Sequence, residues 1–344
     1  MAPAISSPAY PLVSAVIPTR DRADLLTSAV ASALQQTWPN LEVVVVIDGQ
    51  DPATEARLAG FADRRVRVVT LSENCGAAEA RNAGVRAAKG EWIAFLDDDD
   101  EWLPGKIARQ MGAARTLPDW FPVISSRVIA RSPSSTRILP VKPYEAPQAI
   151  ADYLFCRSGL RKPGGVMQCS TLLAPRELLL AIPFESGLPM HQDWDWLIRV
   201  ASHQGVGLTM LREPLSIWRV EDNRATVGRT PDWQFSLAWI RSLRPLISRR
   251  AYCWFIAVEC AWRVQACHAG FFARLLLLRA FLSEGRPEFR SLLSFLLFSF
   301  IPRRLRQSMR KGTLPLGTAP ISTHGLHLVY SRRPVYPVFR NSSR

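Results

Sequence analysis

The chain has 344 residues, of which 48% are hydrophobic and 21% are charged. This composition is typical of a folded globular protein and excludes a mainly disordered chain. The net charge of +14 is concentrated near the end, because residues 236–344 hold 18 Lys and Arg against three acids. A basic segment of this kind can bind nucleic acid or an anionic membrane. Its basic residues alternate with long apolar runs, so an anionic membrane surface is a candidate partner and no nucleic acid is expected.

The six cysteines show no Cys-x-x-Cys spacing, and no basic segment followed by an apolar core opens the chain. We therefore expect a reducing, cytoplasmic environment. Cys253, Cys260 and Cys267 repeat every seven residues, which predicts three small core side chains on one helix face.

Strands and helices alternate in the first third of the chain, after residues 1–11, which are rich in Pro, Ala and Ser and are expected to be frayed. The predicted strands are residues 13–18, 41–47, 66–71 and 92–96, and the predicted helices are residues 23–36, 52–61 and 77–88. Strands that are apolar throughout indicate a parallel sheet covered on both faces. The pattern predicts an α/β fold with a doubly wound, Rossmann-like, mostly parallel sheet, whose ligands bind beyond the carboxyl ends of the strands.

Four aspartates, Asp97 to Asp100, follow the strand at residues 92–96, and Glu101 comes directly after them. Neighbouring carboxylates repel one another unless a cation or a set of donors neutralises them. Hard oxygen ligands suit Mg²⁺ or Mn²⁺, which proteins hold through one or two carboxylates together with substrate phosphates. The sequence therefore predicts a divalent metal site here, and the alternative is a solvated acidic loop.

Four segments in this order resemble the family 2 glycosyltransferases of the GT-A fold. They are Val-Ile-Pro-Thr-Arg-Asp-Arg at 16–22, Val-Val-Val-Ile-Asp-Gly at 44–49, Asn-Cys-Gly-Ala-Ala-Glu-Ala-Arg-Asn-Ala-Gly at 74–84, and Phe-Leu-Asp-Asp-Asp-Asp at 95–100. The resemblance covers about residues 12–225. It implies a GT-A domain at 12–235 that binds a nucleotide-diphosphate sugar, with a UDP-sugar favoured.

The resemblance also implies roles for single residues. Pro18, Thr19 and Arg20 correspond to the loop that cradles the nucleobase, and Asp48 to the acid that accepts from its ring N–H. Arg81 corresponds to a helix arginine that reaches the base or the phosphates. Taken alone, each of these residues could instead serve as a cap or turn, and Asp48 with the glycine after it is a common turn pair.

The acidic run matches the Asp-x-Asp motif of the family. Asp97 is implied to lie near the ribose and Asp98 to belong to the nucleotide-sugar site. Asp99 is implied to hold a Mg or Mn ion that bridges the diphosphate. Such an ion offsets the charge that develops on the departing diphosphate.

A second informative stretch begins at His191. The family carries an acidic pair here whose second member is the general base, and this chain reads Gln192-Asp193. The resemblance therefore assigns the catalytic base to Asp193, with Asp195 as the alternative. His191 could be a base or a metal ligand, although a lone histidine near a helix start is more often a packing residue.

Aromatic residues near this stretch allow two interpretations. Trp194, Trp196 and Trp218 could stack on sugars, but such residues are more often core. Residues 218–226 resemble a loop that closes over the donor and could form a lid. Residues 161–173 resemble a loop and strand that face the donor sugar.

The remaining segments carry weaker signals. A helix is predicted at 106–114, a strand at 123–130 and a variable surface loop at 132–147. Residues 236–310 form a predicted basic, apolar helical extension, followed by an irregular basic tail at 311–344.

Within the extension, residues 251–282 and 289–301 are apolar and helical in period, but neither is an uninterrupted run of the roughly 20 residues that span a bilayer. We expect helices that lie in a membrane interface, or else a helical cap on the substrate side or a dimer interface.

These observations predict a metal-dependent, inverting glycosyltransferase that acts on a saccharide or lipid-linked acceptor, in cell-surface polysaccharide or glycolipid synthesis. It is expected to be cytoplasmic and peripheral on the inner face of the cell membrane. A nucleotidyltransferase would need a Gly-rich loop after the first strand, and residues 18–21 are not such a loop. The other alternative is a basic protein, associated with membrane or nucleic acid, that carries an inactive GT-A domain.

Overall fold

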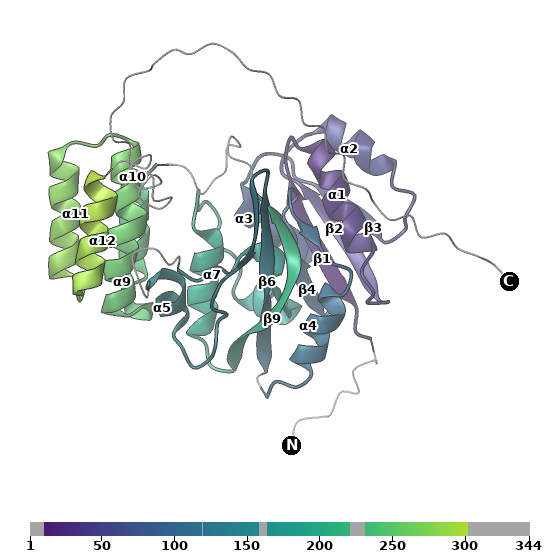
Figure 1. The fold of residues 1–344 in the computed structure, drawn as a ribbon. Helices are drawn as coiled ribbons and strands as arrows, with labels where there is room; N and C mark the ends of the chain where they lie inside the picture. The colour runs from purple at the N-terminus through teal and green to yellow at the C-terminus, as the bar shows by residue number, and fades with distance from the viewer. Residues whose placement is uncertain (1–9, 119, 158–163, 221–230, 302–344) are drawn as a thin grey trace, which may run out of the picture. The chain divides into compact units, whose positions relative to one another are not determined.

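A nine-stranded sheet organises the part of the chain that the computed structural model describes, residues 10–118, 120–157, 164–220 and 231–301 (Figure 1). The strand order is β3-β2-β1-β4-β8-β6-β9-β5, with β7 paired to β6. The strands are β1 (Val13–Thr19), β2 (Leu41–Ile47), β3 (Val66–Thr70), β4 (Trp92–Phe95), β5 (Glu101–Trp102), β6 (Phe121–Ser132), β7 (Ser135–Leu139), β8 (Leu173–Pro175) and β9 (Val206–Arg219).

Helices flank the sheet and form a group at the end of the described chain. They are α1 (Ala23–Leu34), α2 (Pro52–Ala59), α3 (Ala77–Ala87), α4 (Lys106–Ala114), α5 (Ile150–Phe155), α6 (Arg176–Ala181), α7 (Gln192–Ala201), α8 (Trp233–Ser242), α9 (Arg249–Phe255), α10 (Ala261–Ala266), α11 (Phe271–Ser283) and α12 (Phe289–Phe300). Short 3-10 turns, η1 (Cys169–Thr171) and η3 (Arg244–Leu246), and a π-helical segment, η4 (Ile256–Cys260), complete the set.

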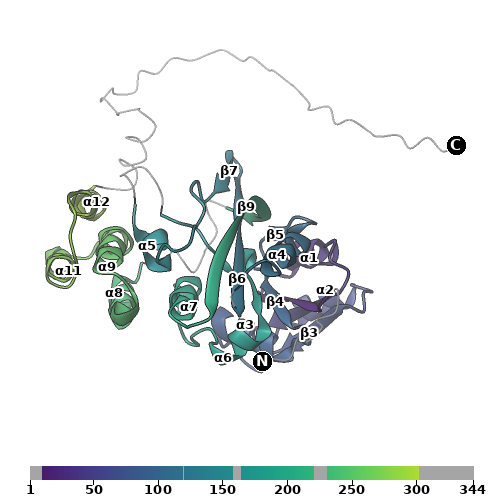
Figure 2. The ribbon, with the colours of Figure 1, turned by 90° about the horizontal axis from the view of Figure 1, so that it is seen from below.

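The first half of the sheet is parallel, as predicted. β1 pairs in parallel with β2 and β4, and β2 pairs in parallel with β3. Val13, Ala15 and Ile17 pack on the face covered by α1, α2 and α4, whereas Val16 packs on the opposite face with α3 and α7 (Figure 2). Both faces are therefore buried, which explains why these strands are apolar throughout.

The second half of the sheet is mixed and departs from the prediction in two places. β8 runs antiparallel to β4 and β6, and β6 pairs in parallel with the long strand β9, which was not predicted. The predicted surface loop at 132–147 is wrong in part, because β7 pairs with β6 there. The hydroxyl of Ser132 accepts a hydrogen bond from the Ser135 backbone N–H at 3.1 Å, which closes a tight hairpin. The Pro and Ser content of the segment, on which the loop prediction depended, does not reveal this hairpin.

The predicted helical stretch at 251–282 is interrupted in the structure. It consists of α9, η4, α10 and α11. The helix is interrupted between α10 and α11, where His268 adopts a positive φ of 53°. Because of this break, Cys253 and Cys260 are buried but Cys267 is exposed, so the three cysteines do not share a buried face.

The C-terminal helices pack on the α/β part through a shared apolar core. Phe255 of α9 meets Phe155 of α5 edge to face, with ring centroids 5.1 Å apart. The Trp239 indole of α8 donates to the Asp195 carboxylate of α7 at 3.0 Å. The first contact attaches the extension to α5, and the second attaches it to α7, whose first turn contains the predicted base Asp193.

Some predictions fall outside the described residues. They concern residues 1–9 of the N-terminus, 161–163 of the predicted donor-side loop, 221–226 of the predicted lid, and the tail at 311–344. The boundaries at 12–235 and 236–310 remain predictions.

The close packing of α3 on the sheet gives a test of the fold. A Cβ placed on Gly84 would lie 2.3 Å from a Val16 methyl carbon, whereas one on Gly112, on the exposed side of α4, would meet nothing within 4 Å. We expect Gly84→Ala to lower the free energy of unfolding by about 1–3 kcal/mol through overpacking. Gly112→Ala should be neutral or stabilise by up to about 1 kcal/mol through helix propensity. Urea unfolding of both variants measures this, and equal effects would contradict the close approach.

Candidate active site

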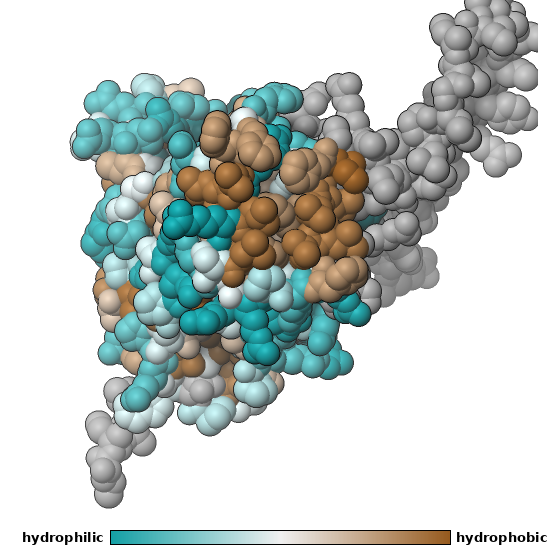
Figure 3. All heavy atoms as spheres, turned by 90° about the vertical axis from the view of Figure 1, so that its left-hand side faces the viewer, coloured by the Kyte–Doolittle hydropathy of each residue, from teal (hydrophilic) through white to brown (hydrophobic). Residues whose placement is uncertain are grey.

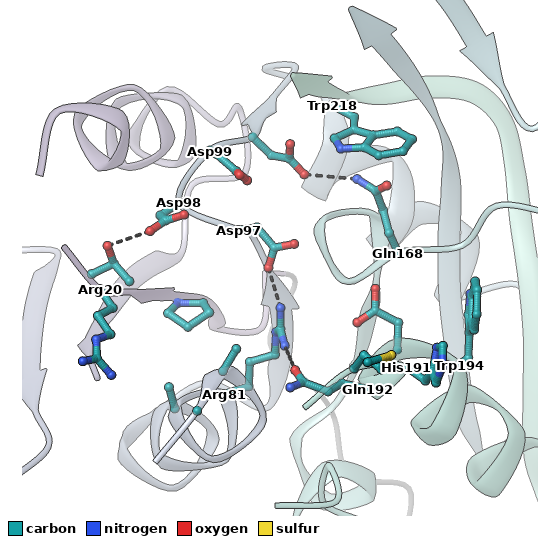
Figure 4. A pocket seen from close by; sticks show the side chains of 18 of the residues that line it. Arg20, Arg81, Asp97, Asp98, Asp99, Gln168, His191, Gln192, Trp194 and Trp218 are labelled. Atoms are coloured by element: carbon teal, nitrogen blue, oxygen red, sulfur yellow. Dashed lines mark hydrogen bonds and ion pairs between the residues drawn. The ribbon is translucent and has the colours of Figure 1, made fainter. Parts of the chain in front are cut away.

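A cavity of about 920 Å³ opens beyond the carboxyl ends of β1, β2 and β4 (Figure 4). All nine residues predicted from the sequence line it, namely Pro18, Thr19, Arg20, Asp48, Arg81, Asp97, Asp98, Asp99 and Asp193. Further lining residues were not singled out from the sequence, among them Arg22, Asp100, Gln168, Glu259 and Arg263. Arg22 and Asp100 lie inside the predicted motifs, but Glu259 and Arg263 lie in the helical extension and carried no sequence signal.

Donors from the loop after β1 partly neutralise the acidic run. The Thr19 hydroxyl donates to Asp98 at 2.8 Å, and the Arg22 guanidinium donates to Asp98 at 3.1 Å and to Asp99 at 3.4 Å. Burial raises the pKa of Asp98, and the positive charge of Arg22 opposes that rise. Asp98 therefore joins the ends of β1 and β4, while Asp99 borders the cavity with its side chain 19% exposed.

Asp100 is almost completely buried. Gln168 donates to its Oδ2 at 3.1 Å, and its buried Oδ1 has no hydrogen-bond partner among the described residues. Burial, followed by the negative charges of Asp97 and Asp99, raises the pKa of Asp100 well above its usual value. A cation at this point would reverse that shift.

The oxygen atoms of the acidic run suit a divalent cation, but they would fill only part of its coordination shell. The run offers hard carboxylate oxygens, and no described residue bonds the buried Oδ1 of Asp100. Within the described ranges no three His, Cys, Asp or Glu side chains are grouped to hold a metal ion by themselves. Magnesium commonly takes one or two carboxylates and completes its shell with water and substrate phosphates.

Asp48 shapes the wall of the cavity. Its two carboxylate oxygens accept from the backbone N–H groups of Cys75 at 2.7 Å and Gly76 at 2.9 Å. Gly76 precedes α3 and has a φ of 86°, a conformation that favours glycine. Asp48 thus fixes the loop that leads into α3, and its contact with a nucleobase remains a prediction.

Arg81 connects the two ends of the cavity. Its guanidinium donates to Asp97 at 2.6 Å and to the side-chain oxygen of Gln192 at 2.9 Å (Figure 4). The residue is only 6% exposed. One buried cation therefore ties the acidic run after β4 to the start of α7.

Asp193, in the first turn of α7, also lines the cavity. The Cys169 backbone N–H donates to its Oδ2 at 3.1 Å, and the Cys169 thiol donates to its Oδ1 at 3.0 Å. Burial raises the pKa of Asp193, the Arg81 charge opposes that rise, and the hydrogen bonds from Cys169 also lower it.

Asp195 is placed differently. It is 5% exposed, and its two oxygens accept from Arg199 at 2.7 Å and from Trp239 at 3.0 Å. Asp195 does not line the cavity, so α7 presents only one of the two candidate bases there.

Only some of the aromatic candidates line the cavity. Trp194 and Trp218 line the cavity, whereas Trp196 is completely buried in the core. His191 also lines the cavity, but its ring stacks on Trp194 with centroids 5.1 Å apart, and its Nε2 lies 3.0 Å from the Ser236 hydroxyl. Burial, aided by the positive charge of Arg263, lowers the pKa of His191 to about 2. A neutral, stacked histidine fits a packing role better than that of a base.

The chain is similar to known glycosyltransferases. The family model described as "Glycosyl transferase family 2" matches residues 14–145. The amylovoran biosynthesis glycosyltransferase AmsB of Erwinia amylovora is 27% identical over 246 residues, which are 69% of this chain and 79% of AmsB. The succinoglycan biosynthesis protein ExoO of Rhizobium meliloti is 43% identical over 104 residues, which are 30% of each chain.

A further relative is an Escherichia coli enzyme, WfgD, named as a UDP-Glc:alpha-D-GlcNAc-diphosphoundecaprenol beta-1,3-glucosyltransferase. It is 35% identical over 100 residues, which are 29% of this chain and 40% of WfgD. The matches to ExoO and WfgD thus span less than half of those proteins.

Solved structures show the same fold. S. aureus TarS 1–349 in complex with UDP-GlcNAc superimposes with a TM-score of 0.52 at 16% identity, covering 88% of this chain and 92% of TarS 1–349. The mannosyltransferase PcManGT of Pyrobaculum calidifontis, in complex with GDP-Man and Mn²⁺, gives a TM-score of 0.51 at 18% identity, covering 86% and 89%. The α/β core with its helical C-terminal part is a GT-A fold.

The lowered pKa of His191 predicts a pH dependence of stability. An unfolded histidine binds a proton below about pH 6.5, and the folded His191 does not, so acid favours unfolding. Between about pH 8 and about pH 5, His191 should therefore account for a loss of up to about 2 kcal/mol in unfolding free energy. His191→Asn, which tolerates the positive φ of 67° at this position, should lose that much less over the same interval. Urea unfolding at both pH values measures it, and an unchanged pH dependence would show that folded His191 accepts a proton.

Proposed function

We propose that this chain is a family 2 glycosyltransferase, as the family-model match of residues 14–145 supports, and that it moves a sugar from a nucleotide-diphosphate sugar to an acceptor hydroxyl with inversion. A UDP-sugar is the favoured donor. Pro18, Thr19 and Arg20 cradle the nucleobase beside Asp48, while Arg81 and Asp97 hold the ribose and diphosphate. The proposal is supported by one observation above all, that the acidic run and Asp193 line a single cavity in which Arg81 binds both Asp97 and Gln192, the neighbour of Asp193.

The chemistry proposed for Asp193 is that of a general base. Its carboxylate takes the proton of the acceptor hydroxyl, the hydroxyl oxygen forms a bond to the anomeric carbon, and the carbon–oxygen bond to the diphosphate breaks. The electron pair leaves with the diphosphate. A single displacement of this kind inverts the anomeric centre. A pKa raised by burial suits the role, because a base acts best when its pKa approaches the working pH.

The contacts of α7 favour Asp193 over Asp195 as the base. Both oxygens of Asp195 are bonded within the protein interior and face away from the cavity. Asp193 borders the cavity and is oriented by two donors from Cys169. The position of Asp193 thus allows an acceptor to reach it.

We further propose that Asp99 holds a Mg or Mn ion, with Asp100 next to it as a second carboxylate. Such an ion would supply positive charge that stabilises the leaving diphosphate. Arg22 would share this task from the protein side, since it already contacts the carboxylates of Asp98 and Asp99.

The acceptor is proposed to be a saccharide attached to a membrane lipid, in the synthesis of a cell-surface polysaccharide or glycolipid. The names of AmsB, ExoO and WfgD place those relatives in such pathways, and that of WfgD specifies a lipid diphosphate acceptor. Trp194 and Trp218 give the cavity two aromatic surfaces suited to sugar rings. Such an acceptor would have the protein act at the cytoplasmic surface of the membrane.

Replacing each α7 carboxylate in turn tests the base. Asp193→Asn keeps the size of the side chain but cannot accept the proton, so kcat should fall by about 10²–10⁴-fold while nucleotide affinity is kept. Asp195→Asn should instead lower the free energy of unfolding by about 1–3 kcal/mol, because a buried charged acceptor is lost, and should affect kcat far less. UDP release from a panel of UDP-sugars with lipid extract as acceptor measures kcat. The reverse pattern would transfer the role to Asp195.

Calorimetric titration with UDP and dTDP tests the donor site. In the presence of Mn²⁺ we expect wild type to bind UDP, and Asp99→Asn to lose the metal-dependent part of the affinity because it removes the charge of a proposed ligand. Asp193→Asn is the matched control and should bind normally. Equal binding by Asp99→Asn and wild type would show that Asp99 is not a metal ligand. No nucleotide binding by wild type would overturn the proposed function.

A further inference from the structure

One side of α11 and α12 carries large apolar side chains that nothing in the described structure covers. Figure 3 looks onto this side and shows them as a contiguous brown patch. The patch, called here the α11–α12 face, consists of Phe271, Phe272, Leu275, Leu276, Leu282, Phe289, Leu293, Leu296 and Phe300, which are 38–83% exposed. Patches of this kind on a folded protein mark interaction sites.

The α11–α12 face is not needed to pack the two helices. Leu277, Ala280 and Phe281 of α11 and Phe295 of α12 point inward and are almost completely buried, and the rings of Phe281 and Phe295 stack with centroids 5.4 Å apart. Phe289, Leu293, Leu296 and Phe300 recur at intervals of four, three and four residues along α12, which places them on one outer side. A helix that is apolar on both sides has a second apolar partner.

The length of the helices limits what this partner can be. α11 has 13 residues and α12 has 12, and none of the helices in the described ranges is long and apolar enough to cross a membrane. Helices of this length with an exposed apolar side can lie in the plane of a bilayer interface.

The charges around the face favour an anionic partner. Arg279, Arg286 and Arg290 are exposed on these helices and their connection. The two acidic residues of the same segment form ion pairs with arginines outside it. Glu284 pairs with Arg241 at 2.5 Å, and Glu288 pairs with Arg250 at 2.8 Å.

The sequence that follows α12 adds positive charge. Residues 302–344 contain no acid and nine basic residues, Arg303, Arg304, Arg306, Arg310, Lys311, Arg332, Arg333, Arg340 and Arg344. Two copies of the chain meeting through this face would bring the exposed arginines of α11, α12 and their connection together, and like charges repel. Anionic lipid headgroups attract them.

We propose that the α11–α12 face docks the enzyme on the surface of an anionic phospholipid bilayer, with its Phe and Leu side chains in the interface and its arginines on the headgroups. The inference extends the proposed function and rests on it for its purpose. η4 and α10 pack against α12, and they also supply Glu259 and Arg263 to the wall of the active-site cavity. Docking through α12 would therefore couple the acceptor side of that cavity to the membrane in which a lipid-linked acceptor resides.

Vesicle flotation of the full chain tests the proposal. Wild type should float with vesicles of phosphatidylcholine and phosphatidylglycerol, less with phosphatidylcholine alone, and less at high salt. The double variant Phe272→Ser/Phe289→Ser removes two side chains that are 83% and 80% exposed, so it should fold normally and lose roughly tenfold or more of its partition coefficient. The matched control Trp120→Ser/Val141→Ser removes exposed apolar side chains remote from the face, which are 84% and 73% exposed, and should float as wild type does.

A charge variant separates the electrostatic part of the membrane contact from the apolar part. Arg279→Gln/Arg286→Gln should weaken flotation only with vesicles that contain phosphatidylglycerol, and should reduce its dependence on salt. Equal flotation of the Phe double variant and wild type would overturn the proposal. So would light scattering that shows a wild-type dimer which this variant converts to a monomer, because a second copy would then occupy the face.

UDP titration of the same samples distinguishes this inference from the proposed function. Loss of flotation with UDP binding intact in the Phe double variant supports docking by a separate surface. Wild type that binds UDP but floats with neither kind of vesicle overturns the docking alone. Wild type that floats but binds no nucleotide overturns the proposed function alone.

Discussion

The repulsion among Asp97, Asp98, Asp99 and Asp100 is the constraint around which the site is built. Four carboxylates at the end of a buried strand raise one another's pKa unless cations and donors are placed against them. Side chains from three segments bind these carboxylates. They are Arg22 after β1, Arg81 from α3 and Gln168 before β8. The compensation is incomplete at Asp100, whose pKa is raised and whose Oδ1 has no hydrogen-bond partner in the part of the chain that the structure describes, a combination that suits the proposed cation.

The helical extension stabilises the other half of the site. α8 places an indole against Asp195, and the aromatic rings of Trp239 and Phe255 pack around His191 at the start of α7. These contacts hold the start of α7, and with it Asp193, against the helical extension. The extension therefore supports the helix that carries the proposed base, and it also carries the α11–α12 face proposed to dock on the membrane.

Some of the structure could be predicted from the sequence because the signals are local. The apolar runs of β1, β2 and β4 predicted buried parallel strands, and the polar residues that follow them met in one cavity because parallel strands share an edge. β9 was missed because Arg212, Glu213 and Pro214 interrupt its pattern where a bulge disturbs its pairing with β6. Glu259 and Arg263 could not be placed, since only tertiary packing brings them to the cavity.

Gln192 stands where the resemblance to family 2 glycosyltransferases implies the first acid of a pair, and its contacts favour a neutral side chain. The Gln192 amide oxygen accepts from Arg81 at 2.9 Å, and its amide nitrogen donates to the Leu188 carbonyl at 2.7 Å. An ionised glutamate could accept from Arg81 but could not donate to Leu188. It would also add a negative charge beside Asp97 and Asp193, which already share the Arg81 cation. A neutral side chain that both accepts and donates therefore leaves more of the Arg81 charge for Asp97 and for an anionic donor.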